Sequence, residues 1–127
     1  MMVNENMTAL VVDDDPDLIG VAKLALNSAG IKDVSLAADG LEAKRLVEAA
    51  DRPFSVVICD WVMPGLDGPG FLSFFRQDNV RSPFIMLSGK STDTEFSAIS
   101  RNPNDYFLTK QSSLDEIIAL IQKVIKT

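Results

Sequence analysis

Five polar side chains in this sequence each lie at the end of a short apolar run, and their types suit phosphoryl transfer. They are Asp13, Asp14, Asp60, Ser88 and Lys110. A charged side chain at the end of a buried strand is costly unless another group uses it. Three carboxylates within roughly 5 Å of one another repel by about 3 kcal/mol per pair at an effective dielectric constant near 20. Either one of them is then protonated, or a cation lies among them.

The residue types around this cluster favour a hard metal ion and a phosphoryl group. The sequence contains no His and a single Cys, and an acid-rich, all-oxygen pocket favours Mg²⁺ or Mn²⁺ over zinc. Lys110 and Ser88 provide the charge partner and the hydrogen-bond donor that a transferred phosphoryl group needs. Asp60 is then the expected nucleophile, forming an aspartyl phosphate.

The elements that must position these residues follow an α/β pattern. Apolar runs predict strands over residues 9–12, 34–37, 54–59, 84–87 and 106–109, each followed by a helical pattern. The expected helix caps are Asp15, Asp39, Asp67, Thr92 and Ser113. Such alternation with short loops predicts a parallel sheet whose ligands bind beyond the carboxyl ends of the strands. The helix expected over residues 92–101 has few apolar residues and is predicted to be short and weakly packed.

Composition excludes several classes of function. The 127 residues carry 12 Lys and Arg against 18 Asp and Glu, a net charge of −6, which argues against nucleic acid as a direct partner. One Cys excludes an internal disulfide. No apolar run approaches the roughly 18–20 residues needed to span a bilayer, and no export signal begins the sequence. We therefore expect one cytoplasmic domain over residues 1–127, without membrane insertion.

Taken together, these motifs resemble the receiver domain of two-component response regulators along nearly the whole chain. The resemblance rests on the acidic run at residues 13–15 before Pro16, on Asp60 with the turn at residues 63–68, and on Ser88 and Lys110. It implies a flavodoxin-like (βα)₅ three-layer sandwich with a parallel five-stranded sheet of order 2-1-3-4-5. Within that family, the sequence resembles single-domain regulators such as those of chemotaxis.

The resemblance also implies a mechanism of signalling. Asp60 would take a phosphoryl group from the phosphohistidine of a sensor histidine kinase or a histidine phosphotransfer protein. Mg²⁺ would be held by Asp14, Asp60 and the backbone carbonyl of Val62, with Asp13 reaching the ion through water. The domain would catalyse only its own phosphorylation and slow dephosphorylation. It would regulate a downstream protein through the face formed by its fourth helix, fifth strand and fifth helix.

Switching in this family links the hydroxyl position to an aromatic residue of the fifth strand. By resemblance Lys110 and Ser88 contact the phosphoryl oxygens, and movement of Ser88 makes room for Phe107 to turn inward. Phe107 has no hydroxyl, so its signal must come from packing. Lys90 and Val62 are expected to flank the phosphate entrance and to influence phosphate lifetime.

The sequence departs from the family pattern after Lys110 and before the fifth strand. Gln111 follows the lysine where the family usually has proline, and a non-proline cis bond costs about 2.5–4 kcal/mol. A trans peptide is expected here, with a shifted loop and Lys110 less fixed. Residues 102–105 replace the usual Gly-Ala pair. These departures concern the output face and leave the phosphorylation residues in place.

One alternative function uses the same residues differently. Asp13-x-Asp15 after an apolar strand also resembles the nucleophile motif of haloacid-dehalogenase-like phosphatases, with Ser88 and Lys110 as later motifs. Against this reading, the chain is short for such an enzyme and Asp60 would have no role.

Overall fold

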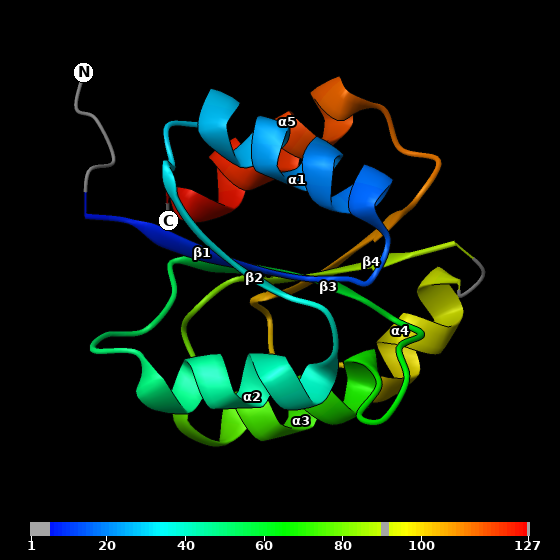
Figure 1. Ribbon diagram of the computed structural model, residues 1–127. Coiled ribbons are helices and arrows are strands. Elements are labelled where there is room, and N and C mark those ends of the chain that lie inside the picture. The colour runs from blue at the N-terminus through cyan, green and yellow to red at the C-terminus, as the bar shows by residue number, and fades with distance from the viewer. Residues whose placement is uncertain (1–5, 90–91, 127) are drawn as a thin grey trace.

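The computed structural model describes residues 6–89 and 92–126, which form a three-layer α/β sandwich. Its five parallel strands lie in the order β2-β1-β3-β4-β5, as predicted. Figure 1 shows α1 and α5 on one face of the sheet and α2, α3 and α4 on the other. The elements are β1 (Thr8–Val12), α1 (Pro16–Ser28), β2 (Asp33–Ala37), α2 (Gly40–Ala49), β3 (Val56–Asp60), α3 (Gly68–Asp78), β4 (Phe84–Ser88), α4 (Asp93–Ile99), β5 (Asp105–Thr109) and α5 (Leu114–Ile125).

Two strands extend one residue further than the apolar runs predict. Asp60 pairs with Leu87, and Ser88 pairs with Thr109, so both polar residues belong to the sheet. The third strand also starts later than expected, at Val56, and β1, β2 and β5 each start one residue earlier. The prediction followed hydrophobicity, whereas strand ends depend on backbone hydrogen bonds that polar residues make equally well. The sheet therefore holds the backbones of Asp60 and Ser88 directly.

Side-chain caps begin the helices where the sequence predicts them. The five expected residues each accept a hydrogen bond from a backbone N–H of the first turn: Asp15, Asp39, Asp67, Thr92 and Ser113. At α2, Asp39 and Glu42 are spaced as in a capping box, in which the Glu42 side chain would accept the Asp39 N–H. Here Glu42 accepts the N–H of Ala38 instead (2.8 Å). After α1, Gly30 adopts a positive φ of 98°, as a glycine following a helix commonly does.

The core consists of two apolar layers separated by the sheet. β3 is buried along its whole length, as expected for a strand covered on both faces. The layer under α2, α3 and α4 is rich in aromatic rings, with Phe71, Phe75 and Phe84 fully buried. The prediction of a short, weakly packed fourth helix is confirmed, since α4 has seven residues and buries one of them, Phe96. Among the helices of the described residues, none is long and apolar enough to cross a membrane.

Candidate functional site

Three carboxylates meet at the carboxyl edge of the sheet. Ligand atoms of Asp13, Asp14 and Asp60 all lie within 4.8 Å of one another. Asp13 and Asp60 are only 4% and 6% exposed, whereas Asp14 is exposed. The Asp13 N–H continues the ladder to Ala37 (3.0 Å), and its Oδ1 accepts the Asp15 N–H (2.9 Å) at the turn into α1. The strand thus delivers one carboxylate to the interior of the site and the next to solvent.

Lys110 brings a positive charge to this cluster. Its Nζ lies 3.1 Å from Oδ1 of Asp60 and 3.6 Å from Oδ2 of Asp13. Its backbone N–H donates to the carbonyl of Ser88 (2.8 Å), which ties the end of β5 to the end of β4. No peptide among the described residues is cis, so the bond to Gln111 is trans, as expected. Lys110 thus contacts both buried carboxylates without the usual proline.

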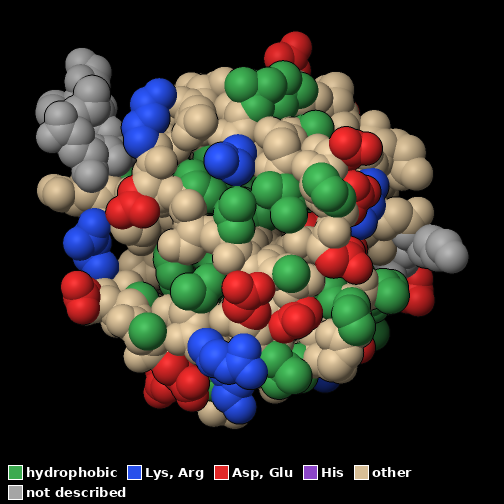
Figure 2. Space-filling view, viewed as in Figure 1, with side chains coloured by type: hydrophobic (Ala, Val, Ile, Leu, Met, Phe, Trp, Pro, Cys, Tyr) green, Lys and Arg blue, Asp and Glu red, His purple; other side chains and the backbone are tan. Residues whose placement is uncertain are grey.

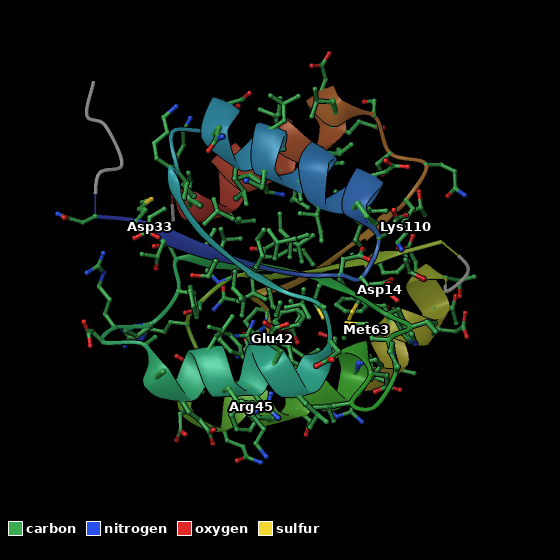
Figure 3. All side chains as sticks on the ribbon, in the orientation of Figure 1. Asp14, Asp33, Glu42, Arg45, Met63 and Lys110 are labelled. Atoms are coloured by element: carbon green, nitrogen blue, oxygen red, sulfur yellow. The ribbon has the colours of Figure 1, made fainter. Side chains whose placement is uncertain are left out.

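Figures 2 and 3 show how this edge of the sheet differs from the opposite one. In Figure 3, Asp14 and Lys110 lie near each other beyond one end of the strands, and Asp33 lies at the other end. Acidic side chains lie beside a basic one at the corresponding end of the surface in Figure 2, and Asp14 is exposed there. The charged cluster is therefore accessible from the surface, although two of its carboxylates are buried.

Burial and neighbouring charges shift the pKa values of groups in and beside the site. Burial raises the pKa of Asp13, and the nearby charge of Asp60 raises it further, against the lowering effects of the Asp15 N–H and of Lys110. Partial burial alone would lower the pKa of Lys110, but its hydrogen bond with Asp60 and the charge of Asp13 raise it. Burial also raises the pKa of the Cys59 thiol well above its ordinary value. Cys59 therefore stays a neutral thiol and acts as an inert core residue. The negative charges of the site belong to the carboxylates.

The donor atoms of the cluster fit a hard divalent cation. All three side chains offer oxygen, and Mg²⁺ prefers few carboxylates together with waters. A bound cation would also offset the carboxylate repulsion that Lys110 balances only in part. Val62 lies in the loop between β3 and α3 with 68% of its surface exposed, and Lys90 lies outside the described residues.

Replacing Asp13 with Asn tests the cost of this charge. The pKa of Asp13 is higher in the folded than in the unfolded chain. Its contribution to the free energy of unfolding therefore falls as the pH rises from the unfolded-state pKa through the folded-state pKa. Asn can still accept the Asp15 N–H. We expect Asp13→Asn to raise the melting temperature at pH 7 without Mg²⁺ by about 2–5 °C, roughly 1 kcal/mol for a domain of this size, and by less at pH 4. Thermal unfolding at both pH values measures this, with the exposed Asp33→Asn as control; equal shifts for both variants would contradict it.

Ser88 and Phe107 lie on the same face of the sheet, toward α4. Ser88 is buried, with 2% of its surface exposed. Phe107 pairs with Met86 in the ladder, and its ring packs on Phe96 of α4 (centroids 5.5 Å apart) and edge-on to Trp61 (6.5 Å). The aromatic residue singled out by the sequence therefore links the residue after Asp60 to α4. The contacts of Trp61 and Phe96 with this ring were not predicted.

A buried ion pair at the opposite edge was also missed. Oδ1 of Asp105, the first residue of β5, accepts from Nη2 (2.6 Å) and Nε (2.9 Å) of Arg76 in α3. Its Oδ2 accepts from the hydroxyl of Ser100, which ends α4. Asn102 and Asn104 donate to the carbonyl of Val80. The residues that replace the family's Gly-Ala pair thus connect α3, α4 and β5.

Comparison with known proteins establishes the family. The chain belongs to the response regulator receiver domain family, whose model matches residues 9–122. Proteins of this family are the phosphoaccepting switches of two-component systems, and they generally bind Mg²⁺. The phosphatase alternative finds no support, and in this structure Asp15 caps α1 by accepting the Asp17 N–H.

The relatives include regulators of several kinds. TcrA of Mycobacterium tuberculosis, a transcriptional regulatory protein, is 32% identical over 113 residues, which are 89% of this chain and 44% of TcrA. Chemotaxis protein CheY-3 of Vibrio cholerae is 32% identical over 71% of this chain and 69% of its own length. The sensor kinase CckA of Brucella abortus is 29% identical over 94% of this chain and 12% of its own. The chain thus spans less than half the length of TcrA and a small part of CckA.

A solved structure agrees with the fold over nearly the whole chain. The receiver domain of the Francisella response regulator 1452 superposes with a TM-score of 0.77 at 32% identity, covering 95% of this chain and 98% of that one. The predicted flavodoxin-like fold is therefore confirmed both by the strand order and by this structure.

Proposed function

We propose that Asp60 is the phosphoacceptor of this receiver domain and that the reaction depends on Mg²⁺. The observation that carries this proposal is the position of Asp60: a buried carboxylate with Asp13 and Asp14 on one side and the Lys110 ammonium 3.1 Å away. A carboxylate oxygen of Asp60 attacks the phosphorus of a phosphohistidine, the P–N bond breaks, and the imidazole leaves. The domain catalyses this transfer and its own slow dephosphorylation.

The other site residues stabilise charge on the transferred group. Asp14, Asp60 and the carbonyl of Val62 would hold Mg²⁺ (or Mn²⁺), with Asp13 acting through water. The bound ion supplies positive charge to the phosphoryl oxygens. Lys110 pairs with one of these oxygens, and the Ser88 hydroxyl donates to another.

The partners in this proposal are proteins at both ends of the signal. A sensor histidine kinase or histidine phosphotransfer protein supplies the phosphoryl group, and a downstream protein reads the change. Ser88 and Phe107 pass the change to the face formed by α4, β5 and α5, a role supported by the contact between Phe107 and Phe96 of α4. We also propose that the protein acts in the cytoplasm and does not contact nucleic acid directly.

Chemical phosphorylation tests the metal requirement without any partner. We expect the chain to gain one phosphoryl group from acetyl phosphate in the presence of Mg²⁺ and none with excess EDTA, because the carboxylate repulsion and the charge of the donor are then unbalanced. Intact-mass spectrometry counts the groups added. Equal incorporation in EDTA would contradict the metal requirement, and no incorporation under any condition would contradict phosphorylation at this site.

A further inference from the structure

The first turn of α2 touches the loop between β3 and α3 more closely than any side chain would permit. A Cβ placed on Gly40 would lie 2.9 Å from Cβ and 3.0 Å from the carbonyl carbon of Leu66, and closer still to the Leu66 carbonyl oxygen. Carbon atoms in van der Waals contact lie about 3.5–4.0 Å apart. Because the closest of these atoms belong to the backbone, a rotamer change cannot relieve the overlap.

Close approach, and not backbone conformation, explains the glycine at this position. Among the described residues, the glycines with positive φ are Gly30 and Gly65. Gly40 has a conformation open to any residue, so the missing side chain serves to admit the loop. Next to it, Leu41 lies against the loop as well, because a Cβ on Gly65 would be 3.5 Å from Cδ1 of Leu41.

The same loop is fixed at its base and carries a residue of the site. The Gly68 N–H donates to the carbonyl of Trp61 (2.8 Å), which closes the loop directly after Asp60. Met63 is buried within it, with 6% of its surface exposed. Leu66 would have to move by roughly 1 Å relative to α2 to restore normal contact, and the bond at the base of the loop directs such a movement into residues 62–67.

We propose that Gly40 is a positioning residue: it seats the β3–α3 loop on α2 and thereby holds the Val62 carbonyl where a metal ion needs it. The inference rests on the proposed function, because the role of Val62 belongs to that proposal. Gly40 itself touches neither metal nor phosphate. Its effect reaches the site through the backbone of one loop, as outer contacts commonly tune metal ligands.

Gly40→Ala separates this role from a general loss of stability. We expect the Mg²⁺ dissociation constant, measured by calorimetry, to rise about tenfold, the lower end of the usual effect of outer-shell changes. The Mg²⁺ concentration that half-saturates phosphorylation by acetyl phosphate should rise equally, while the rate at saturating Mg²⁺ stays near that of the wild type. Gly20→Ala is the matched control, because a Cβ there meets nothing within 4 Å.

Two further variants keep the test decisive. Leu46 belongs to the same helix but lies beside Thr8, Asp33 and Phe54 at the other edge of the sheet, so Leu46→Ala should lower the melting temperature and leave Mg²⁺ affinity unchanged. Leu41→Ala removes an exposed side chain that lies against Gly65, so it should fold normally and weaken Mg²⁺ binding less than Gly40→Ala does. Wild-type Mg²⁺ affinity in folded Gly40→Ala would overturn the inference, as would wild-type affinity in Leu41→Ala if Gly40→Ala does not fold. Absence of Mg²⁺ binding or phosphorylation in the wild type would instead overturn the proposed function.

Discussion

Asp60→Asn is expected to abolish phosphorylation by acetyl phosphate and by any histidine kinase. The amide lacks the charged oxygen that attacks phosphorus, so no acyl phosphate forms. Asn has nearly the same shape, so the fold should be retained at a position that is 6% exposed and paired within the sheet. Intact-mass spectrometry after incubation with acetyl phosphate and Mg²⁺ should show no phosphorylated species, where the wild type gains one group.

A neighbouring carboxylate provides the control for this loss. Asp15→Asn also removes one negative charge near the site, but Asn caps a helix as well as Asp does. Asp15 accepts the N–H of Asp17 at 3.0 Å, a bond that Asn can also make. Phosphorylation of Asp15→Asn should therefore match that of the wild type. Undiminished phosphorylation of Asp60→Asn, with the group mapped to Asp13, would contradict the assignment and place the nucleophile on β1.

Local sequence patterns predicted which residues lie at the ends of strands and which residues cap helices. Asp13, Asp60 and Lys110 come together because each follows a run that forms a parallel strand, and parallel strands place their carboxyl ends at one edge. The caps Asp39 and Ser113 were readable because a capping residue and its N–H partner lie only a few positions apart. These relations depend on neighbours in the chain, which a single sequence contains.

Contacts between segments far apart in the chain could not be predicted in this way. Gly40 and Leu66 meet through backbone atoms, and nothing in a glycine's type says which segment approaches it. The packing of Phe107 between Trp61 and Phe96 depends on where α4 settles, which its sparse apolar residues did not specify. Arg76 and Asp105 are 29 positions apart, and each alone looks like an ordinary surface charge. Side-chain partners at long range follow from the packed fold and not from spacing.

The largest effect on stability is expected from Arg76→Gln. The Asp105 side chain is 1% exposed and depends on Arg76 for its countercharge, while Ser100 satisfies its other oxygen. The guanidinium also donates to the carbonyls of Asn79 and Ser82, both at 2.7 Å. Removing one partner of a buried pair leaves an uncompensated charge and typically costs 3–5 kcal/mol. We expect a loss of about that size in urea unfolding, with a melting temperature lower by roughly 10 °C or more.

Arg101→Gln is the matched control for this prediction. Arg101 is exposed, and its guanidinium donates to the carbonyls of Ala98 and Ser100 at the end of α4. Its replacement should change the free energy of unfolding by less than about 0.5 kcal/mol, as surface substitutions usually do. Equal losses for Arg76→Gln and Arg101→Gln would contradict a special role for the buried pair.

A paired substitution distinguishes the cost of the orphaned charge from the value of the pair. Replacing a buried ion pair by apolar residues is often nearly neutral, so Arg76→Met with Asp105→Leu should recover much of the stability that Arg76→Met alone loses. The pair lies at the amino edge of β5, and Lys110 follows the carboxyl end of that strand. Phosphorylation of the folded double variant at Asp60 should therefore stay near the wild-type rate. If the proposed response of α4 to phosphorylation weakens nonetheless, measured by hydrogen exchange, then the link from Asp105 to Ser100 contributes to that response.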